Sequence, residues 1–178
     1  MSGRRGPVRP STTRSPVALW GKSLLNAVLF FGLFMVLLPW IANRLAPTPL
    51  PVPRAVATWG GGAIFVAGVA VWLTCLDLFS RRGGGTPFPL DAPRELVTGG
   101  PFAAVRNPIM LAELAVIWAE VLWFASLGIL LYALVISVLA HLSVVWVEEP
   151  ELRRRFGEGY QAYARRVPRW LPRLPARR

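Results

Sequence analysis

Five ionisable residues stand inside or at the end of two long apolar runs in the C-terminal half: Glu113, Glu120, His141, Glu148 and Glu149. A charged group at the centre of a membrane helix costs about 2.5 to 3.5 kcal/mol on insertion scales, so each of these groups needs a role. Carboxylates attract cations, and an imidazole donates or accepts a hydrogen bond. We expect a polar site that opens at the cytoplasmic face; a purely structural polar pair between helices is the alternative.

The positions of Glu113 and His141 suggest how such a site could be built. Glu113 lies about five residues, or roughly 8 Å, inside its apolar run, and His141 lies seven residues, or roughly 10 Å, before Glu148. If the two runs form an antiparallel hairpin, the two side chains lie at similar depths and could meet.

The apolar runs themselves predict an all-α integral membrane protein. The chain has 178 residues, of which 54% are hydrophobic and 16% charged, and its mean hydropathy is +0.46. A membrane helix needs roughly 20 apolar residues. Four runs reach or approach that length, at residues 24–42, 56–79, 108–125 and 127–147. The last two are separated by only a few residues, which predicts a C-terminal helical hairpin followed by a cytoplasmic tail.

The distribution of basic residues predicts the orientation. Eighteen of the 20 Lys and Arg residues lie before the first run, between the second and third, or after the fourth; the other two connect the first two runs. By the positive-inside rule, both termini and the middle loop are cytoplasmic. The net charge of +11 then reflects topology and attraction to anionic lipid headgroups, and we expect no nucleic-acid partner.

We divide the chain into three parts. Residues 1–18 form a disordered cytoplasmic leader, residues 19–79 hold two membrane helices, and residues 80–178 hold the middle loop, the hairpin and the tail. The first apolar run is longer than the core of a signal peptide, which favours a retained anchor over cleavage. Cys75 is the single cysteine of the chain, so an intramolecular disulfide is excluded.

The tail after Glu149 carries a helical pattern. Pro150 predicts that the membrane helix ends near the carboxylate pair and that a new helix begins there. Apolar residues then recur every three or four positions, at Leu152, Phe156, Tyr160, Tyr163 and Val167. Two glycines, at 157 and 159, predict a bend. The simpler alternative for the tail is a basic amphipathic helix on the membrane surface. For the glycine-rich loop before residue 108, the simpler alternative to a ligand-binding role is a flexible connector.

Two longer motifs resemble the isoprenylcysteine carboxyl methyltransferase and phospholipid methyltransferase superfamily. The segment LVTGGPFAAVRNP resembles the family's L-V-T-x-G-P-(Y/F)-x-x-x-R-(H/N)-P entry to the membrane hairpin. His141 followed by EEPELRRRFGEGYQAYARRVPRWLP resembles its H-x6-E-E-x-x-L…F-G-x-x-Y-x-x-Y…V-P-R-x-x-P ending. The similarity covers residues 94–172, and the first two runs resemble the family only in being apolar.

This resemblance implies a methyltransferase of the bacterial inner membrane that uses S-adenosylmethionine and has no metal site. It implies cofactor contacts from Leu96, Val97, Gly100, Phe102, Asn107, Pro108, His141, Glu148, Glu149, Tyr160 and Tyr163. Catalytic or substrate-binding roles fall to His141, Arg106, Glu148 and Arg169, with His141 acting either as a hydrogen-bonding group or as a base. A sulfonium cation suits carboxylate and aromatic surroundings.

Three positions depart from the family pattern and leave the methyl acceptor open. Asn107 replaces a histidine of the eukaryotic members, Met110 replaces a tyrosine, and Val144 stands where eukaryotic members have an arginine that contacts the substrate. We expect a lipophilic or small-molecule acceptor that offers a carboxylate, an amine or a thiol, beside the membrane lipids that surround the protein. The competing hypothesis is a non-catalytic scaffold or small transporter that retains the family fold.

Overall fold

The computed structural model describes residues 28–78 and 95–172, and within these ranges it consists of helices and their connections, with no β-strand. The predicted leader at 1–18 and most of the predicted middle loop lie outside the described residues. The described part therefore confirms the all-helical class and contains every residue predicted for the site.

The helices follow one another in four groups. The first group runs from Val28 through the π-helical η1 (Leu33–Leu37) into α2 (Leu38–Leu45). The second joins η2 (Val56–Gly60) to α3 (Gly61–Leu78). The short α4 (Pro101–Ala104) then precedes α5 (Pro108–Phe124). The last group joins α6 (Leu127–Ser143), η5 (Val144–Glu148) and α7 (Glu149–Arg166), and α7 is kinked at Gly157.

Three of the described helices are long and apolar enough to cross a membrane, namely Val28–Leu45, Val56–Leu78 and Leu127–Arg166. Large apolar side chains such as Val66 and Val135 are exposed along them, as expected of surfaces that face lipid. The protein is therefore a membrane protein. α5, with 17 residues, coincides with the remaining predicted apolar run.

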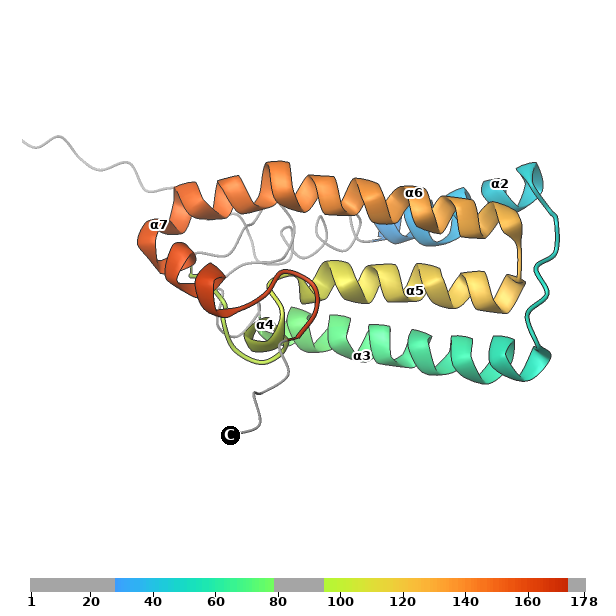
Figure 1. The fold of residues 1–178 in the computed structure, drawn as a ribbon, viewed down its shortest axis with the longest axis horizontal. Coiled ribbons are helices and arrows are strands. Elements are labelled where there is room, and N and C mark those ends of the chain that lie inside the picture. The colour runs from blue at the N-terminus through green and yellow to red at the C-terminus, as the bar shows by residue number, and fades with distance from the viewer. Residues whose placement is uncertain (1–27, 79–94, 173–178) are drawn as a thin grey trace, which may run out of the picture.

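The helices pack closely where small residues meet backbone. α5 lies between α3 and α6 in the bundle (Figure 1). On α3, an added Cβ at Gly68 would lie 3.0 Å from the carbonyl oxygen of Ala112 on α5; on α6, an added Cβ at Gly128 would collide with the carbonyl of Ala42 on α2. Such contacts let helix backbones approach each other, which is how membrane helices commonly associate.

One end of the bundle is closed by the connection between α2 and η2. The backbone N–H of Leu50 donates to the carbonyl of Ala125 (2.6 Å), and that of Leu127 donates to Thr48 (2.9 Å). Ala125 ends α5 in a left-handed conformation, with φ of 43°, which reverses the chain before α6. The predicted site lies at the opposite end, where α4 and α7 meet (Figure 1).

The prediction of a helix break at the carboxylate pair was wrong. Glu148 and Glu149 both have helical φ and ψ, and the chain continues without interruption into α7. Pro150 lies two residues after the π-helical η5, and the helix continues through it although a proline has no backbone N–H to donate. The change of direction comes instead at Gly157 (φ 54°, ψ −126°), one of the two glycines for which a bend was predicted.

Candidate active site

The tail returns to the start of α5 after the bend at Gly157. Three hydrogen bonds attach it there. The Tyr163 hydroxyl donates to the carbonyl of Phe102 (2.7 Å), and the backbone N–H of Arg106 donates to the carbonyl of Pro168 (2.8 Å). The Asn107 side chain donates to the carbonyl of Arg169 (3.4 Å). The tail and the segment before α5 therefore form one unit, although about 60 residues separate them in the sequence.

A buried carboxylate is the centre of this unit. The Glu149 side chain is only 3% exposed, and Arg169 binds it with two hydrogen bonds, Nε to Oε1 at 2.6 Å and Nη2 to Oε2 at 3.0 Å. Arg106 approaches the same Oε1 at 3.2 Å, and Arg153 approaches Oε2 at 3.7 Å. Three guanidinium groups from three segments thus surround one carboxylate, an arrangement that gives strong, directional pairing.

These contacts shift the ionisation of both main partners. Burial by itself raises the pKa of Glu149, but the hydrogen bonds from Arg169 and the charges of Arg106, Arg169 and Arg153 outweigh it and lower that pKa below its ordinary 4.5. The hydrogen bond to Glu149 raises the pKa of Arg169. Glu149 and Arg169 are therefore both ionised throughout the neutral pH range.

The neighbouring carboxylate, Glu148, has a different environment. It is partly buried, its electrostatic neighbours include the carboxylates of Glu113 and Glu149, and no cation pairs with it among the described residues. Trp72 on α3 also lies near the Glu113 carboxylate. The two adjacent glutamates thus differ sharply. Glu149 contacts three arginines, whereas Glu148 has no positively charged partner among the described residues.

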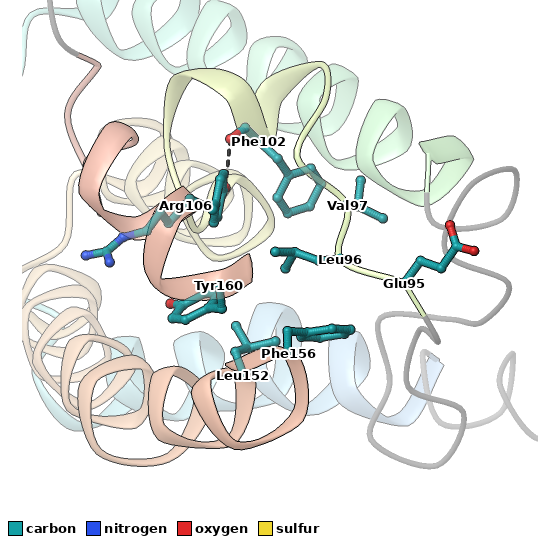
Figure 2. A pocket seen from close by; sticks show the side chains of 9 residues that line it. Glu95, Leu96, Val97, Phe102, Arg106, Leu152, Phe156 and Tyr160 are labelled. Carbon is teal, nitrogen blue, oxygen red and sulfur yellow. Dashed lines mark hydrogen bonds between the residues drawn. The ribbon is translucent and has the colours of Figure 1, made fainter. Parts of the chain in front are cut away.

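A small cavity lies beside the arginine cluster, between α7 and the segment that leads into α4 (Figure 2). Its volume is about 70 Å³, and it is lined by Glu95, Leu96, Val97, Phe102, Arg106, Leu152, Phe156, Tyr160 and Tyr163. The Phe102 ring lies near Leu96 and Val97, whereas the carboxylate of Glu95 points away from the others (Figure 2). The lining is mostly apolar and aromatic.

The cavity contains much of the predicted cofactor set. Leu96, Val97, Phe102, Tyr160 and Tyr163 line it together with Arg106. The apolar stripe predicted in the tail is confirmed as a packed cluster of Tyr160, Tyr163 and Val167 with Leu152 and Phe156. Sequence reasoning did not assign Leu152 and Phe156 to the pocket, although their positions in that stripe already carried the signal.

The other predicted residues lie around the cavity or at its supports. Gly100 has a positive φ of 59°, and an added Cβ there would lie 2.7 Å from Leu78 Cδ1, so it shapes the turn into α4. Asn107 is the N-cap residue of α5, and Pro108 begins that helix. Neither these three nor His141, Glu148, Glu149 and Arg169 line the cavity.

His141 has a different partner from the one considered in the sequence. It is exposed, and its Nδ1 accepts a hydrogen bond of 3.0 Å from the indole N–H of Trp170. The structure therefore pairs His141 with the end of the tail, while Glu113 lies near Trp72. Trp170 was not foreseen as a neighbour. Arg153 was also missed, although its position four residues after Glu149 is typical of an ion pair on a helix.

Comparisons with known proteins give the family of the chain. The family model described as phospholipid methyltransferase matches residues 56–159, more than half of the chain. A curated relative, methanethiol S-methyltransferase 2 of Bradyrhizobium diazoefficiens, is 34% identical over 165 residues, which cover 85% of this chain. The chain spans about 60% of that relative's length. No solved structure matches the chain significantly. The chain belongs to the phospholipid methyltransferase family of membrane methyltransferases.

Proposed function

We propose that this membrane methyltransferase takes its methyl group from S-adenosylmethionine and transfers it, at the cytoplasmic face, to a small or lipophilic acceptor. A small thiol is the first candidate, because the curated relative is named a methanethiol S-methyltransferase. The proposal rests chiefly on two polar groups at the same end of the bundle, a carboxylate and one guanidinium nitrogen, that have no partner among the described residues.

The first of these groups is the Glu148 carboxylate, which is partly buried without a cation among the described residues. The second is Arg106, whose buried Nε has no hydrogen-bond partner there. A buried polar group without a partner costs about 1 to 3 kcal/mol, so each favours a ligand that supplies one. A zwitterionic amino acid with a sulfonium group offers positive charge to Glu148 and a carboxylate to Arg106, and this complementarity is the observation that carries the proposal.

The side chains that line the cavity suit S-adenosylmethionine, but the cavity is too small to hold it in the structure described. Leucine, valine and aromatic side chains suit an adenine ring. Pockets for ligands of this kind measure about 300 to 1,000 Å³, whereas the cavity holds about 70 Å³. Binding therefore requires α7 and the segment before α4 to separate, and the hydrogen bonds that attach the tail control that movement.

Bound at this site, S-adenosylmethionine would supply an electrophilic methyl group. The residues of the chain then orient the donor and exclude water, which is what an in-line displacement requires. With a thiol acceptor, the sulfur forms the new bond to the methyl carbon, the old carbon–sulfur bond breaks, and the thiol proton is released to water. Glu148 and Arg106 would hold the donor during this step, and Glu149 with its arginines would hold the tail in place.

The topology in this proposal has four membrane helices and cytoplasmic termini. α5 is 17 residues long, which corresponds to about 25 Å, and it connects to α6 through two residues, Ala125 and Ser126. Together with the three longer helices, this gives an even number of crossings. The carboxylate pair, the arginines and the cavity then all face the cytoplasm, on the side where basic residues are concentrated.

The test is calorimetric titration of S-adenosylmethionine into the protein purified in detergent. We expect saturable binding by the wild type, and at least tenfold weaker binding by Glu148→Gln, which removes the charge but keeps the shape. The matched control is Glu151→Gln, because Glu151 is 42% exposed and pairs with Arg154 on the outer side of the tail. Absence of binding to folded wild type would instead favour a scaffold or transporter.

A further inference from the structure

The hydrogen bond between Trp170 and His141 determines which nitrogen of the His141 ring carries the proton. The indole Nε1 lies 3.0 Å from Nδ1 of His141, and the two ring centroids are 5.9 Å apart. An indole N–H is only a donor. The Nδ1 atom must therefore present its lone pair, and in the neutral ring the proton must be on Nε2.

Trp170 is held by the same segment that closes the site. Its neighbour Arg169 binds Glu149, and Pro168 accepts the N–H of Arg106. Docking of the tail thus places the indole against His141, and release of the tail removes it. The tautomer of His141 is consequently linked to whether the tail is closed.

We propose that Trp170 is a positioning residue that holds His141 as a hydrogen-bond donor through Nε2, so that His141 binds the acceptor and does not act as the base. The role at the acceptor rests on the methyltransferase function proposed above. While Trp170 is docked, the basic lone pair of the imidazole is occupied, and only an N–H is available. A donor beside the acceptor sulfur stabilises a thiolate, and the thiol then loses its proton to water before transfer.

The tautomer can be observed directly, because the chain contains a single histidine. We would label the protein with ¹⁵N-histidine, purify it through a tag that lacks histidine, and record long-range ¹H–¹⁵N correlations near neutral pH. The wild type should show a protonated Nε2 and an unprotonated Nδ1. Trp170→Phe keeps an aromatic ring but removes the N–H, and its spectrum should move toward a mixture of the two tautomers.

The matched control is Trp59→Phe, since Trp59 is 78% exposed and lies on η2, far along the chain from the site. Its spectrum should equal that of the wild type. A wild-type spectrum with protonated Nδ1, or equal spectra for wild type and Trp170→Phe, would overturn the proposal.

Substitutions of His141 separate a donor from a base. Glutamine offers an amide N–H near the position of Nε2, asparagine offers one near Nδ1, and neither side chain is a base. We expect methyl transfer to be retained best in His141→Gln and to be lower in His141→Asn and His141→Ala. For Trp170→Phe, we expect kcat/KM to fall roughly two- to tenfold, the value of one hydrogen bond.

Equal loss in all three His141 variants would overturn the donor role. A wild type with the expected tautomer but no methyl transfer to any thiol would count against the proposed function, while the positioning of His141 by Trp170 would remain supported. The spectrum and the activity therefore fail independently.

Discussion

Arg169 holds Glu149 through two parallel hydrogen bonds of 2.6 and 3.0 Å, and this pair fastens the end of the tail to the helix that precedes it. The carboxylate is 3% exposed and the guanidinium 30%. The pair joins residues 20 positions apart, on either side of the bend at Gly157. It therefore fixes the closed position of the tail.

Replacement of Arg169 by lysine should weaken this closure although the charge is kept. A lysine cannot form the two-pronged contact of a guanidinium. We expect a loss of about 1.5 to 3 kcal/mol, the range for hydrogen bonds to charged groups, measured as the free energy of unfolding in detergent and as faster proteolysis of the tail. Arg166→Lys, at the exposed last residue of α7, is the control and should change neither.

Acid should open the same contact. The folded-state pKa of Glu149 is lowered from 4.5, so its contribution to stability is fully present above about pH 4.5 and is lost as the pH falls through the lowered value. The stability advantage of wild type over Glu149→Gln should therefore shrink below pH 4.5. Thermal unfolding at a series of pH values measures it, and an advantage that stays constant down to strong acid would contradict this assignment.

The bend at Gly157 can be tested against its neighbour Gly159. Gly157 has φ of 54° with open space around it, whereas Gly159 has open space and no positive φ. Alanine at 157 should cost about 1 to 3 kcal/mol from backbone strain, and alanine at 159 should be neutral or stabilise the helix by about 0.5 to 1 kcal/mol. Equal unfolding free energies in the two variants would show that the bend does not depend on Gly157.

The close packing of α6 on α2 can be tested by comparing alanine substitutions at two other glycines. A methyl group at Gly128 would collide with the carbonyl of Ala42, whereas Gly62 on α3 has nothing within 4 Å of an added Cβ. Gly128→Ala should separate the two helices and lower the yield and melting temperature of the detergent-purified protein. Gly62→Ala should leave both unchanged or slightly higher.

The sequence predicted the helices well because their signals are local. Long apolar runs set the lengths of the membrane helices, and Pro108 marked the start of α5 to the residue. The stripe in the tail and the bend at the glycines were also visible as short-range patterns. The break expected at Pro150 was wrong: the proline follows the π-helical turn of η5, and the helix continues through it.

Contacts between distant segments were not predictable in the same way. The arginines around Glu149 come from positions 106, 153 and 169, and only the i, i+4 partner follows from spacing. Trp170 reaches His141 because Gly157 reverses the helix and Pro168 is bound by Arg106. Those contacts depend on the path of the whole tail, and no short pattern in the sequence encodes them.

The most direct measurement of the central claim follows the methyl group itself. The purified protein would be incubated with S-adenosylmethionine labelled in its methyl group and with methanethiol, and the volatile product would be collected and counted. We predict labelled dimethyl sulfide from the wild type and at least a tenfold lower rate from Glu148→Gln, with Glu151→Gln unchanged. If folded wild type transferred no label to a thiol, a lipid amine or a carboxylate, the proposal of an S-adenosylmethionine-dependent methyltransferase would be contradicted.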